Sequence, residues 1–253
     1  MDESQPIEEE NTPYYKPAQM MLHGLDYLHN VCRIIHTDLK PDNMMVRLED
    51  KLILEKVALD EFNNPLPQKK RGGRTTYLSR KNYGQPTSVT GLVSIIDFGF
   101  SVKGDGPHNA CIQAEPYRAL EVILDAGWTY SSDKWSLSVM TLFEAINLLR
   151  TVYNDQSHLA HITALLGPPP KYLLARGKRT SLFYDSEAKL KPETEIPADF
   201  SLETSIGKIS GEGKMMFLDF VSRMLKWQPK DRSTAKDLLN DPWLSADFPE
   251  ENA

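Results

Sequence analysis

The sequence has few cysteines, no long apolar run and no excess of basic residues. Its two cysteines, Cys32 and Cys111, cannot form a disulfide framework and lack metal-ligand spacing, so we expect buried free thiols. No apolar run approaches the roughly 18 residues that a membrane-spanning helix needs. The net charge of −6 disfavours a general nucleic-acid-binding protein. Because the acidic start is unlike a signal or transit peptide, we expect a protein of the cytoplasm or nucleus, without nucleic-acid or membrane partners.

The chain is long enough for one large domain or two small ones. It has 253 residues, of which 40% are hydrophobic, enough for a sizeable core. Residues 1–17 are acidic and proline-containing, which predicts a disordered tail. We expect the main domain at 18–246 and a short tail at 247–253.

The apolar pattern predicts mainly helices with a few short strands, an α+β fold. Met21, Leu25 and Leu28 recur at helical spacing and predict a helix over 18–30. The β-rich runs at 44–46 and 92–97 predict short strands. A helix over 131–149 is apolar on more than one face and should be buried all round. Further helices are expected at 158–166, 213–227 and 233–240.

Residues 47–91 are predicted to be an irregular insertion. From Phe62 to Ile96 the sequence has no acidic residue, whereas KKRGGR (69–74) is strongly basic. A basic cluster of this kind is compatible with a nuclear address. A solvated surface insertion is the favoured interpretation.

A set of short polar motifs occurs in a fixed order along the chain. None is decisive alone, because each short spacing occurs by chance. Chance co-occurrence of all of them in one order is remote. They are HTDLKPDN at 36–43, DFG at 97–99, YRALE at 117–121, DKW at 133–135 and Arg232.

In this order the motifs resemble the C-terminal lobe of a eukaryotic protein kinase, over about residues 18–244. More narrowly, HTDLKPDN, YRALEVIL and LLGPPPKYLLARGK resemble the SR-protein-kinase-like group of the CMGC kinases, especially its fungal members. The resemblance implies a serine/threonine protein kinase that uses ATP and Mg²⁺ to phosphorylate a protein substrate.

The resemblance also assigns catalytic roles, and the residue types suit them. Phosphoryl transfer depends on positioning and on charge neutralisation more than on covalent chemistry. Asp38 would orient the substrate hydroxyl, and Lys40 would hold the γ-phosphate. Asn43 and Asp97 offer the hard oxygen ligands that Mg²⁺ prefers, with ATP phosphates completing the shell. Gly99 would let the chain turn sharply after Asp97.

Further residues would support the site. By resemblance, Asp133 would accept hydrogen bonds from the backbone of the catalytic loop. His36 and Phe98 would pack together beneath the site. Glu121 and Arg232 would form the ion pair that anchors the activation segment, for which arginine suits a buried carboxylate better than lysine does.

The sequence departs from the family pattern at several positions. Thr37 stands where most kinases have an arginine that receives an activation-loop phosphate, which indicates that such a switch is absent. The substrate-binding segment of the family, the P+1 loop, includes Ala114, Glu115 and Tyr117. Ala114 replaces a threonine that in the family bridges the catalytic aspartate and lysine. Glu115 falls where CMGC kinases usually carry an arginine that shapes substrate choice. We therefore expect an altered substrate preference and a reduced rate.

The largest departure concerns the N-terminal lobe. Only 35 residues precede His36, and the sequence shows no glycine-rich loop, strand lysine or helix glutamate of the kinase type. We therefore predict a C-terminal lobe without the N-terminal β-lobe. Loss of a single transition-state donor commonly costs about 10² to 10³ in rate, so we expect impaired catalysis.

Two alternatives to an active enzyme stay open. The chain is either a non-catalytic pseudokinase that holds a protein partner, or a fragment of a longer kinase. A lobe without its N-terminal half would expose apolar surface, which a protein partner would cover. Arg/Ser-rich proteins are a candidate substrate class, for which the acidic net charge is only weak support.

Overall fold

The computed structural model describes residues 17–47, 52–78, 92–106, 108–143, 153–191, 200–205 and 211–246. None of the helices in these ranges has the length and apolar character needed to cross a membrane. The described residues form two compact units, one within 46–93 and one comprising the rest. Apart from Pro17, which begins the first helix, the predicted tails at 1–17 and 247–253 lie outside these ranges.

The first helix of the larger unit confirms the helix predicted over 18–30. α1 (Pro17–Asp26) buries Met21, Leu22 and Leu25, and the π-helical turn η1 (Tyr27–Cys32) continues it. Arg33 ends the helical segment with a left-handed backbone, at φ 55°. The chain thereby leaves the helix and enters the first strand.

Two pairs of short strands flank the loop at 36–43 and the DFG segment at 97–99. β1 (Ile34–Ile35) pairs antiparallel with β6 (Val102–Lys103), and β2 (Met44–Val46) pairs with β5 (Val93–Ile95). Both strands predicted from sequence are therefore present. The loop between β1 and β2 ends in the 3₁₀ turn η2 (Pro41–Asn43), and η3 (Phe98–Phe100) follows β5.

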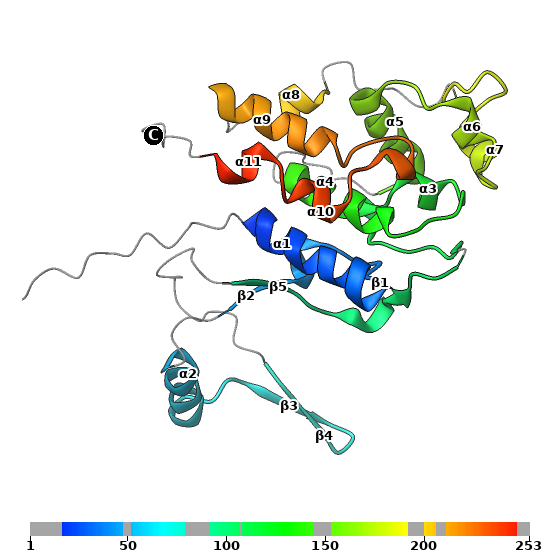
Figure 1. The fold of residues 1–253 in the computed structure, drawn as a ribbon. Helices are drawn as coiled ribbons and strands as arrows, with labels where there is room; N and C mark the ends of the chain where they lie inside the picture. Colours follow the sequence, from blue (N-terminus) through cyan, green and yellow to red (C-terminus); the bar gives the residue numbers. More distant parts are fainter. Residues whose placement is uncertain are drawn as a thin grey trace, which may run out of the picture. The chain divides into compact units, whose positions relative to one another are not determined.

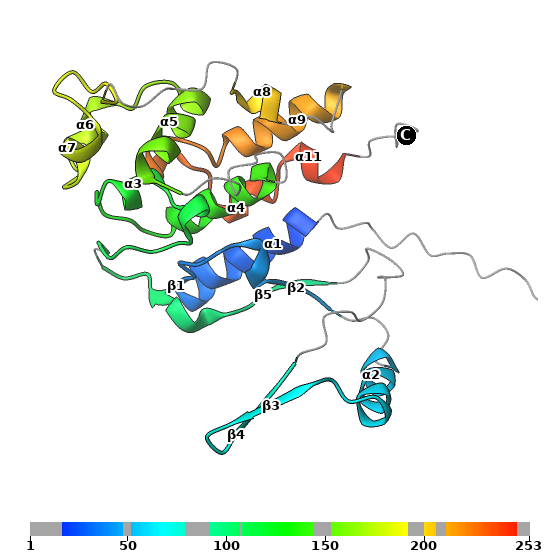
Figure 2. The same cartoon turned by 180° about the vertical axis from the view of Figure 1, so that it is seen from behind.

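α4 (Ser131–Phe143) is the central helix of this unit. It lies between α1 and α9 in both views of the fold (Figures 1 and 2). The side chains described along it are almost all buried, as predicted, with Trp135 only 1% exposed. The last part of the helix predicted over 131–149, from residue 144, lies outside the described residues.

Short helices surround α4. α5 and α9 correspond to the helices predicted at 158–166 and 213–227, and α10, which Thr234 caps, lies within the range predicted at 233–240. The described elements are η4 (Glu115–Tyr117), α3 (Leu120–Ile123), α5 (Asp155–Leu166), α6 (Lys171–Leu174), α7 (Thr180–Phe183), α8 (Leu202–Ser205), α9 (Gly211–Ser222), η6 (Pro229–Asp231), α10 (Ala235–Leu238) and α11 (Pro242–Ser245).

The smaller unit corrects the prediction of an irregular insertion. It contains α2 (Leu52–Asn63) and a hairpin of β3 (Gln68–Arg71) and β4 (Arg74–Tyr77). Gly72 and Gly73 join the strands with φ of 55° and 76°. A two-residue Gly-Gly loop favours a hairpin because both central residues adopt positive φ. The basic residues of KKRGGR therefore lie on exposed strands.

Predicted acid sensitivity rests on a buried histidine of α5. His158 is 5% exposed, and its Nδ1 lies 3.1 Å from the Tyr153 hydroxyl. Burial, and then the nearby His161, lowers the pKa of His158 to about 4. The unfolded chain therefore binds a proton near pH 6.5 that the folded chain does not, so stability should fall between pH 6.5 and 4. At about 1.36 kcal/mol per unit, the loss reaches about 3 kcal/mol.

Urea unfolding at pH 7 and pH 4 measures this loss. His158→Gln should flatten the pH dependence of the unfolding free energy by most of that amount, whereas exposed His23→Gln should leave it as in the wild type. Equal pH dependence in His158→Gln and wild type would contradict the assignment.

Candidate active site

Three of the predicted catalytic residues are in direct contact on the β1–β2 loop. Lys40 Nζ donates to Asp38 Oδ2 at 2.8 Å, and Asn43 Nδ2 donates to the Asp38 carbonyl oxygen at 2.8 Å and to Oδ2 at 3.1 Å. The Asp38 side chain is mostly buried, with 12% of it exposed. The carboxylate is thus fixed by two donors from its own loop.

Lys40 lies in a negative environment. The hydrogen bond to Asp38 is the largest cause that raises the pKa of Lys40, and the charges of Asp38, Asp42 and Asp97 raise it further. Burial opposes this shift. Lys40 therefore stays cationic at neutral pH and can neutralise an anion.

Backbone contacts bring Asp97 to the same place. The Ile96 N–H donates to the Asn43 carbonyl at 3.0 Å, and the His36 ring Nε2 lies 2.9 Å from the Ile96 carbonyl. Asp97 follows directly in the chain, and its charge acts on Lys40. The structure therefore brings together the four residues to which catalytic and metal-binding roles were assigned.

The sharp turn at the DFG motif occurs at Asp97, two residues before Gly99, where it was expected. Asp97 itself adopts the left-handed conformation, with φ 63°, and its Oδ1 accepts a hydrogen bond from the Gly99 N–H. Gly99 has an ordinary φ. A Cβ at Gly99 would lie 3.3 Å from Asp97 Oδ1, so a side chain at this position would crowd that carboxylate.

Asp133, at the start of α4, holds the backbone of the catalytic loop. Its Oδ2 accepts from the His36 N–H at 2.8 Å, and its Oδ1 accepts from the Thr37 N–H at 2.9 Å. The hydrogen bonds predicted for Asp133 are therefore present. Its carboxylate is only 1% exposed, and hydrogen bonds to a charged acceptor are roughly twice as strong as neutral ones.

Two further residues that bind this network were missed by the sequence analysis. His29 Nε2 lies 2.9 Å from Asp133 Oδ2, so η1 also contacts the carboxylate that holds the catalytic loop. Gln113 donates from its backbone N–H to the Thr37 carbonyl, and its buried side chain bonds α4 at the Ser132 carbonyl and at Ser136. No family motif marks Gln113, and only the tertiary structure brings it to the loop.

Thr37 replaces the usual arginine and has its own contacts. Its hydroxyl donates to the Phe100 carbonyl at 2.9 Å, so it links the catalytic loop to the DFG segment. Its φ of 70° is unusual for a β-branched residue. Thr37 therefore contributes a hydrogen bond to the backbone of the DFG segment in place of a phosphate-binding charge.

The predicted ion pair between Glu121 and Arg232 is present and fully buried. The two guanidinium nitrogens donate to the two carboxylate oxygens at 2.6 and 2.7 Å. Arg232 also donates to the Ser131 carbonyl at 3.0 Å and lies 4.8 Å over the Trp135 ring. The pair thereby joins the end of the activation segment to α4.

The packing of His36 with Phe98 is present but partial. The two rings meet edge to face with centroids 5.2 Å apart, while Phe98 remains 46% exposed. Phe100 is 71% exposed. The DFG segment thus presents apolar side chains on the surface of the described chain.

The P+1 loop residues differ in exposure. Tyr117 is buried, and burial raises the pKa of its hydroxyl. Ala114 is half-buried and precedes η4, whereas Glu115 is exposed. Glu115 is therefore free to face a substrate, and Tyr117 supports the loop from within.

The oxygen donors of the site suit a hard cation. Asn43 directs its amide nitrogen toward Asp38, and no described residue donates to its Oδ1. Asp97 uses Oδ1 for Gly99, and its Oδ2 has no partner among the described residues. An amide oxygen and a carboxylate oxygen are ligands that Mg²⁺ prefers. These residues therefore fit the ion that the motifs imply.

A helical lobe in which an aspartate, a lysine and an asparagine share one loop beside a DFG turn has the arrangement that protein kinases use for phosphoryl transfer. The family model of the protein kinase domain matches residues 3–244. The chain therefore belongs to the protein kinase domain family.

Known proteins similar to this chain agree with that family. A serine/threonine protein kinase of Aspergillus fumigatus is 36% identical over 90% of this chain and 56% of its own length. The serine/threonine-protein kinase SRPK of Physarum polycephalum is 28% identical over 92% of this chain and 60% of its own. A crystal structure of a kinase domain matches with a TM-score of 0.60, 26% identity, 90% of this chain and 65% of its own.

These matches bear on the predicted absence of the N-terminal lobe. The family match begins at residue 3 and so gives that absence no support. The chain spans a little over half the length of the Aspergillus kinase that it matches. The fold and the kinase family are confirmed, while the missing lobe stays a proposal.

Breaking the buried ion pair should destabilise the fold strongly. Glu121→Gln leaves the Arg232 charge without its carboxylate in a site with 0% side-chain exposure. Removing one partner of a buried pair typically costs about 3 to 5 kcal/mol. Chemical denaturation of Glu121→Gln should show a loss of this size.

Glu187→Gln is the matched control, because Glu187 pairs with Lys189 at 2.7 Å while both side chains are at least 70% exposed. Exposed pairs contribute little, so this variant should unfold like the wild type. Similar stability losses in both variants would contradict the anchoring role of Glu121.

Proposed function

We propose that this chain carries the catalytic loop and the metal-binding residues of an SR-protein-kinase-like serine/threonine protein kinase. The reaction is ATP-dependent phosphoryl transfer to a protein hydroxyl. The observation that supports it best is the contact of Asp38 with Lys40 and Asn43 on a loop that Asp133 holds. Such positioning is the main catalytic requirement of phosphoryl transfer.

Asp38 orients the acceptor in this proposal. Its Oδ2 accepts hydrogen bonds from Lys40 and Asn43, which leaves the other carboxylate oxygen, Oδ1, for the substrate. That oxygen accepts the hydrogen bond of the substrate hydroxyl and takes its proton as transfer proceeds. General base catalysis of this kind contributes about 10² to 10⁴ in rate.

Lys40, Asn43 and Asp97 handle the charge of the nucleotide. Lys40 is cationic at neutral pH and faces the position where negative charge develops. The free oxygens of Asn43 and Asp97 would hold Mg²⁺, whose charge would neutralise the phosphate oxygens of ATP. The roles of Asn43 and Asp97 use oxygen atoms that no described residue engages, whereas Lys40 Nζ also donates to Asp38.

We propose that residues 1–253 alone transfer phosphate poorly. The sequence contains no glycine-rich loop and no strand lysine that would cover the phosphates. Exposed Phe98 and Phe100 form an apolar surface that an N-terminal lobe or a protein partner would cover. Ala114 removes a hydroxyl that would support Asp38 and Lys40.

The substrate is a protein, and Arg/Ser-rich sequences are the proposed class. The support is the similarity to a kinase named SRPK and the exposed carboxylate of Glu115, in place of an arginine, on the P+1 loop. An acidic residue there favours basic residues next to the acceptor. We propose the cytoplasm or nucleus as the location of the protein, in keeping with this substrate class.

Thermal unfolding with Mg-ATP tests the proposed site. If Mg-ATP binds with a Kd of about 1 mM, about 10 mM ligand stabilises by about 1.4 kcal/mol, which is a few degrees. Asp97→Asn should reduce this shift by removing a charged ligand. Asp38→Asn should keep the shift and lower transfer to a serine peptide by about 10² or more.

Asp105→Asn, an exposed change eight residues beyond Asp97, controls for a general loss of negative charge. It should keep both the shift and the transfer. Absence of any shift in the wild type would contradict nucleotide binding by this chain and favour a scaffold role. Equal losses in Asp38→Asn and Asp97→Asn would contradict the separate roles.

A further inference from the structure

A basic cavity lies apart from the residues assigned to catalysis. Its volume is about 430 Å³, and none of Asp38, Lys40, Asn43 and Asp97 lines it. It is formed by the end of η1, the start of α4, the end of the α6 segment and the chain around η6. Five of its lining side chains are basic: His29, Arg33, Lys134, Arg176 and Lys230.

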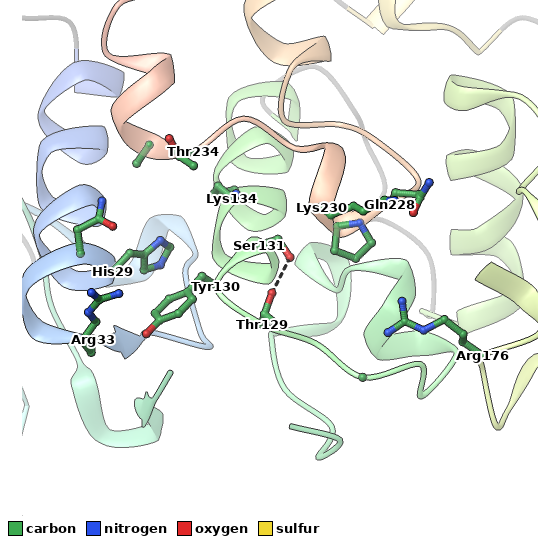
Figure 3. Close-up of a pocket in the computed structure, with 14 residues that line it drawn as sticks. His29, Arg33, Thr129, Tyr130, Ser131, Lys134, Arg176, Gln228, Lys230 and Thr234 are labelled. Carbon is green, nitrogen blue, oxygen red and sulfur yellow. Dashed lines mark hydrogen bonds between the residues drawn. The ribbon is translucent and has the colours of Figure 1, made fainter. Parts of the chain in front are cut away.

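The basic side chains surround the cavity from different parts of the chain. Figure 3 shows His29 and Arg33 on one side, Lys134 between, and Lys230 with Arg176 on the other side. Within the part of the chain that the structure describes, no aspartate or glutamate lines the cavity. The cavity therefore concentrates positive charge in a chain whose net charge is −6.

The lysine and arginine side chains of the cavity lack carboxylate partners among the described residues, whereas His29 contacts Asp133 at 2.9 Å. Arg33 and Lys230 are exposed, and no described side chain bonds to their charged groups. Arg176 donates only to the Ala126 carbonyl, at 3.2 Å, and Lys134 only to the Arg232 carbonyl, also at 3.2 Å. Elsewhere in this unit Arg118, Arg179 and Arg223 each pair with an aspartate.

Lys134 differs from the exposed Arg33 and Lys230 because it is buried and its pKa is lowered. It is 7% exposed, and burial followed by the charge of Arg232 lowers its pKa to about 8. Asp237, Glu121 and Asp133 partly offset this, but each is engaged elsewhere, by Thr234, Arg232 and the catalytic loop respectively. An anion in the cavity would supply the negative charge that Lys134 lacks.

Neutral donors complete the lining. The hydroxyls of Thr129 and Ser131 lie 3.2 Å apart at the cavity, and Gln228 and Asn30 also line it. A phosphate monoester carries a charge of about −1.5 to −2 and three strong acceptor oxygens, which suits several cations with hydroxyl donors better than a single carboxylate does.

We propose that this cavity, formed by Arg33, Lys134, Arg176 and Lys230, binds a phosphate group. The group comes either from a phosphorylated serine or threonine of a peptide or from free inorganic phosphate. The site does not depend on the proposed catalytic function. It is nevertheless connected to the catalytic loop, because His29 lines the cavity and contacts Asp133.

Binding to the purified chain tests the proposal. Isothermal titration at pH 7.5 would use inorganic phosphate, a phosphoserine peptide and the same peptide without phosphate, each at equal ionic strength set with chloride. We expect saturable binding of inorganic phosphate or of the phosphopeptide, and none of the peptide without phosphate. Tighter binding of the phosphopeptide would identify the peptide as the source, and equal binding would identify free phosphate. Absence of saturation by both would overturn the proposal.

Charge-neutral variants locate the site. Arg33→Gln and Lys230→Gln should each raise the Kd about fivefold, and the double variant about 25-fold if the two act independently. Lys226→Gln is the matched control, because Lys226 is exposed on the same loop and does not line the cavity. An equal loss in Lys226→Gln would show a diffuse field instead of a site and overturn the proposal.

The pKa of Lys134, followed by NMR of labelled lysine side chains, gives a second readout that does not involve activity. Saturating phosphate should raise this pKa above its value of about 8, because a nearby anion favours the charged ammonium. An unchanged pKa in the presence of bound phosphate would place the ligand elsewhere.

Discussion

The hydrogen bonds from Asp133 to the catalytic loop are the interaction on which the rest of this site depends. One buried carboxylate accepts the N–H groups of His36 and Thr37 and contacts the His29 ring. The carboxylate belongs to α4, whose described side chains are almost all buried, so its position is fixed by the core. The loop that carries Asp38 is thereby tied to the packed core, which is how a site keeps its geometry.

That tie also holds a strained backbone. Thr37, Asp97 and Gln113 all adopt positive φ, although none is glycine, and each such residue costs of the order of 1 to 3 kcal/mol. Thr37 donates to Asp133 and to the Phe100 carbonyl three residues beyond Asp97, and its own carbonyl accepts the N–H of Gln113. Strain at these positions persists because the surrounding contacts fix the loop from three directions. The loop, the DFG segment and the activation segment therefore form one connected arrangement.

The sequence predicted the local parts of this arrangement better than the connections between them. Helical periodicity located α1 and α4, and motif order located Asp38, Asn43, Asp97 and the Glu121–Arg232 pair. The hairpin of the smaller unit was missed because its Gly-Gly turn lies in a polar segment without strand-like alternation. Gln113 and His29 could not be predicted, because their roles depend on contacts with residues far away in the sequence. The sharp turn was attributed to Gly99, because glycine is the usual residue for such a conformation, whereas Asp97 adopts the positive φ.

Amide hydrogen exchange of His36 and Thr37 in Asp133→Asn tests the central claim most directly. An asparagine offers one acceptor oxygen and places an NH₂ group against the other donor, so at least one amide loses its partner. At about 1.5 to 3 kcal/mol for a hydrogen bond to a charged group, exchange of that amide should accelerate roughly 10- to 150-fold. Amides in the core of α9 should exchange as in the wild type. Unchanged exchange at both His36 and Thr37 would contradict the claim that Asp133 holds the catalytic loop.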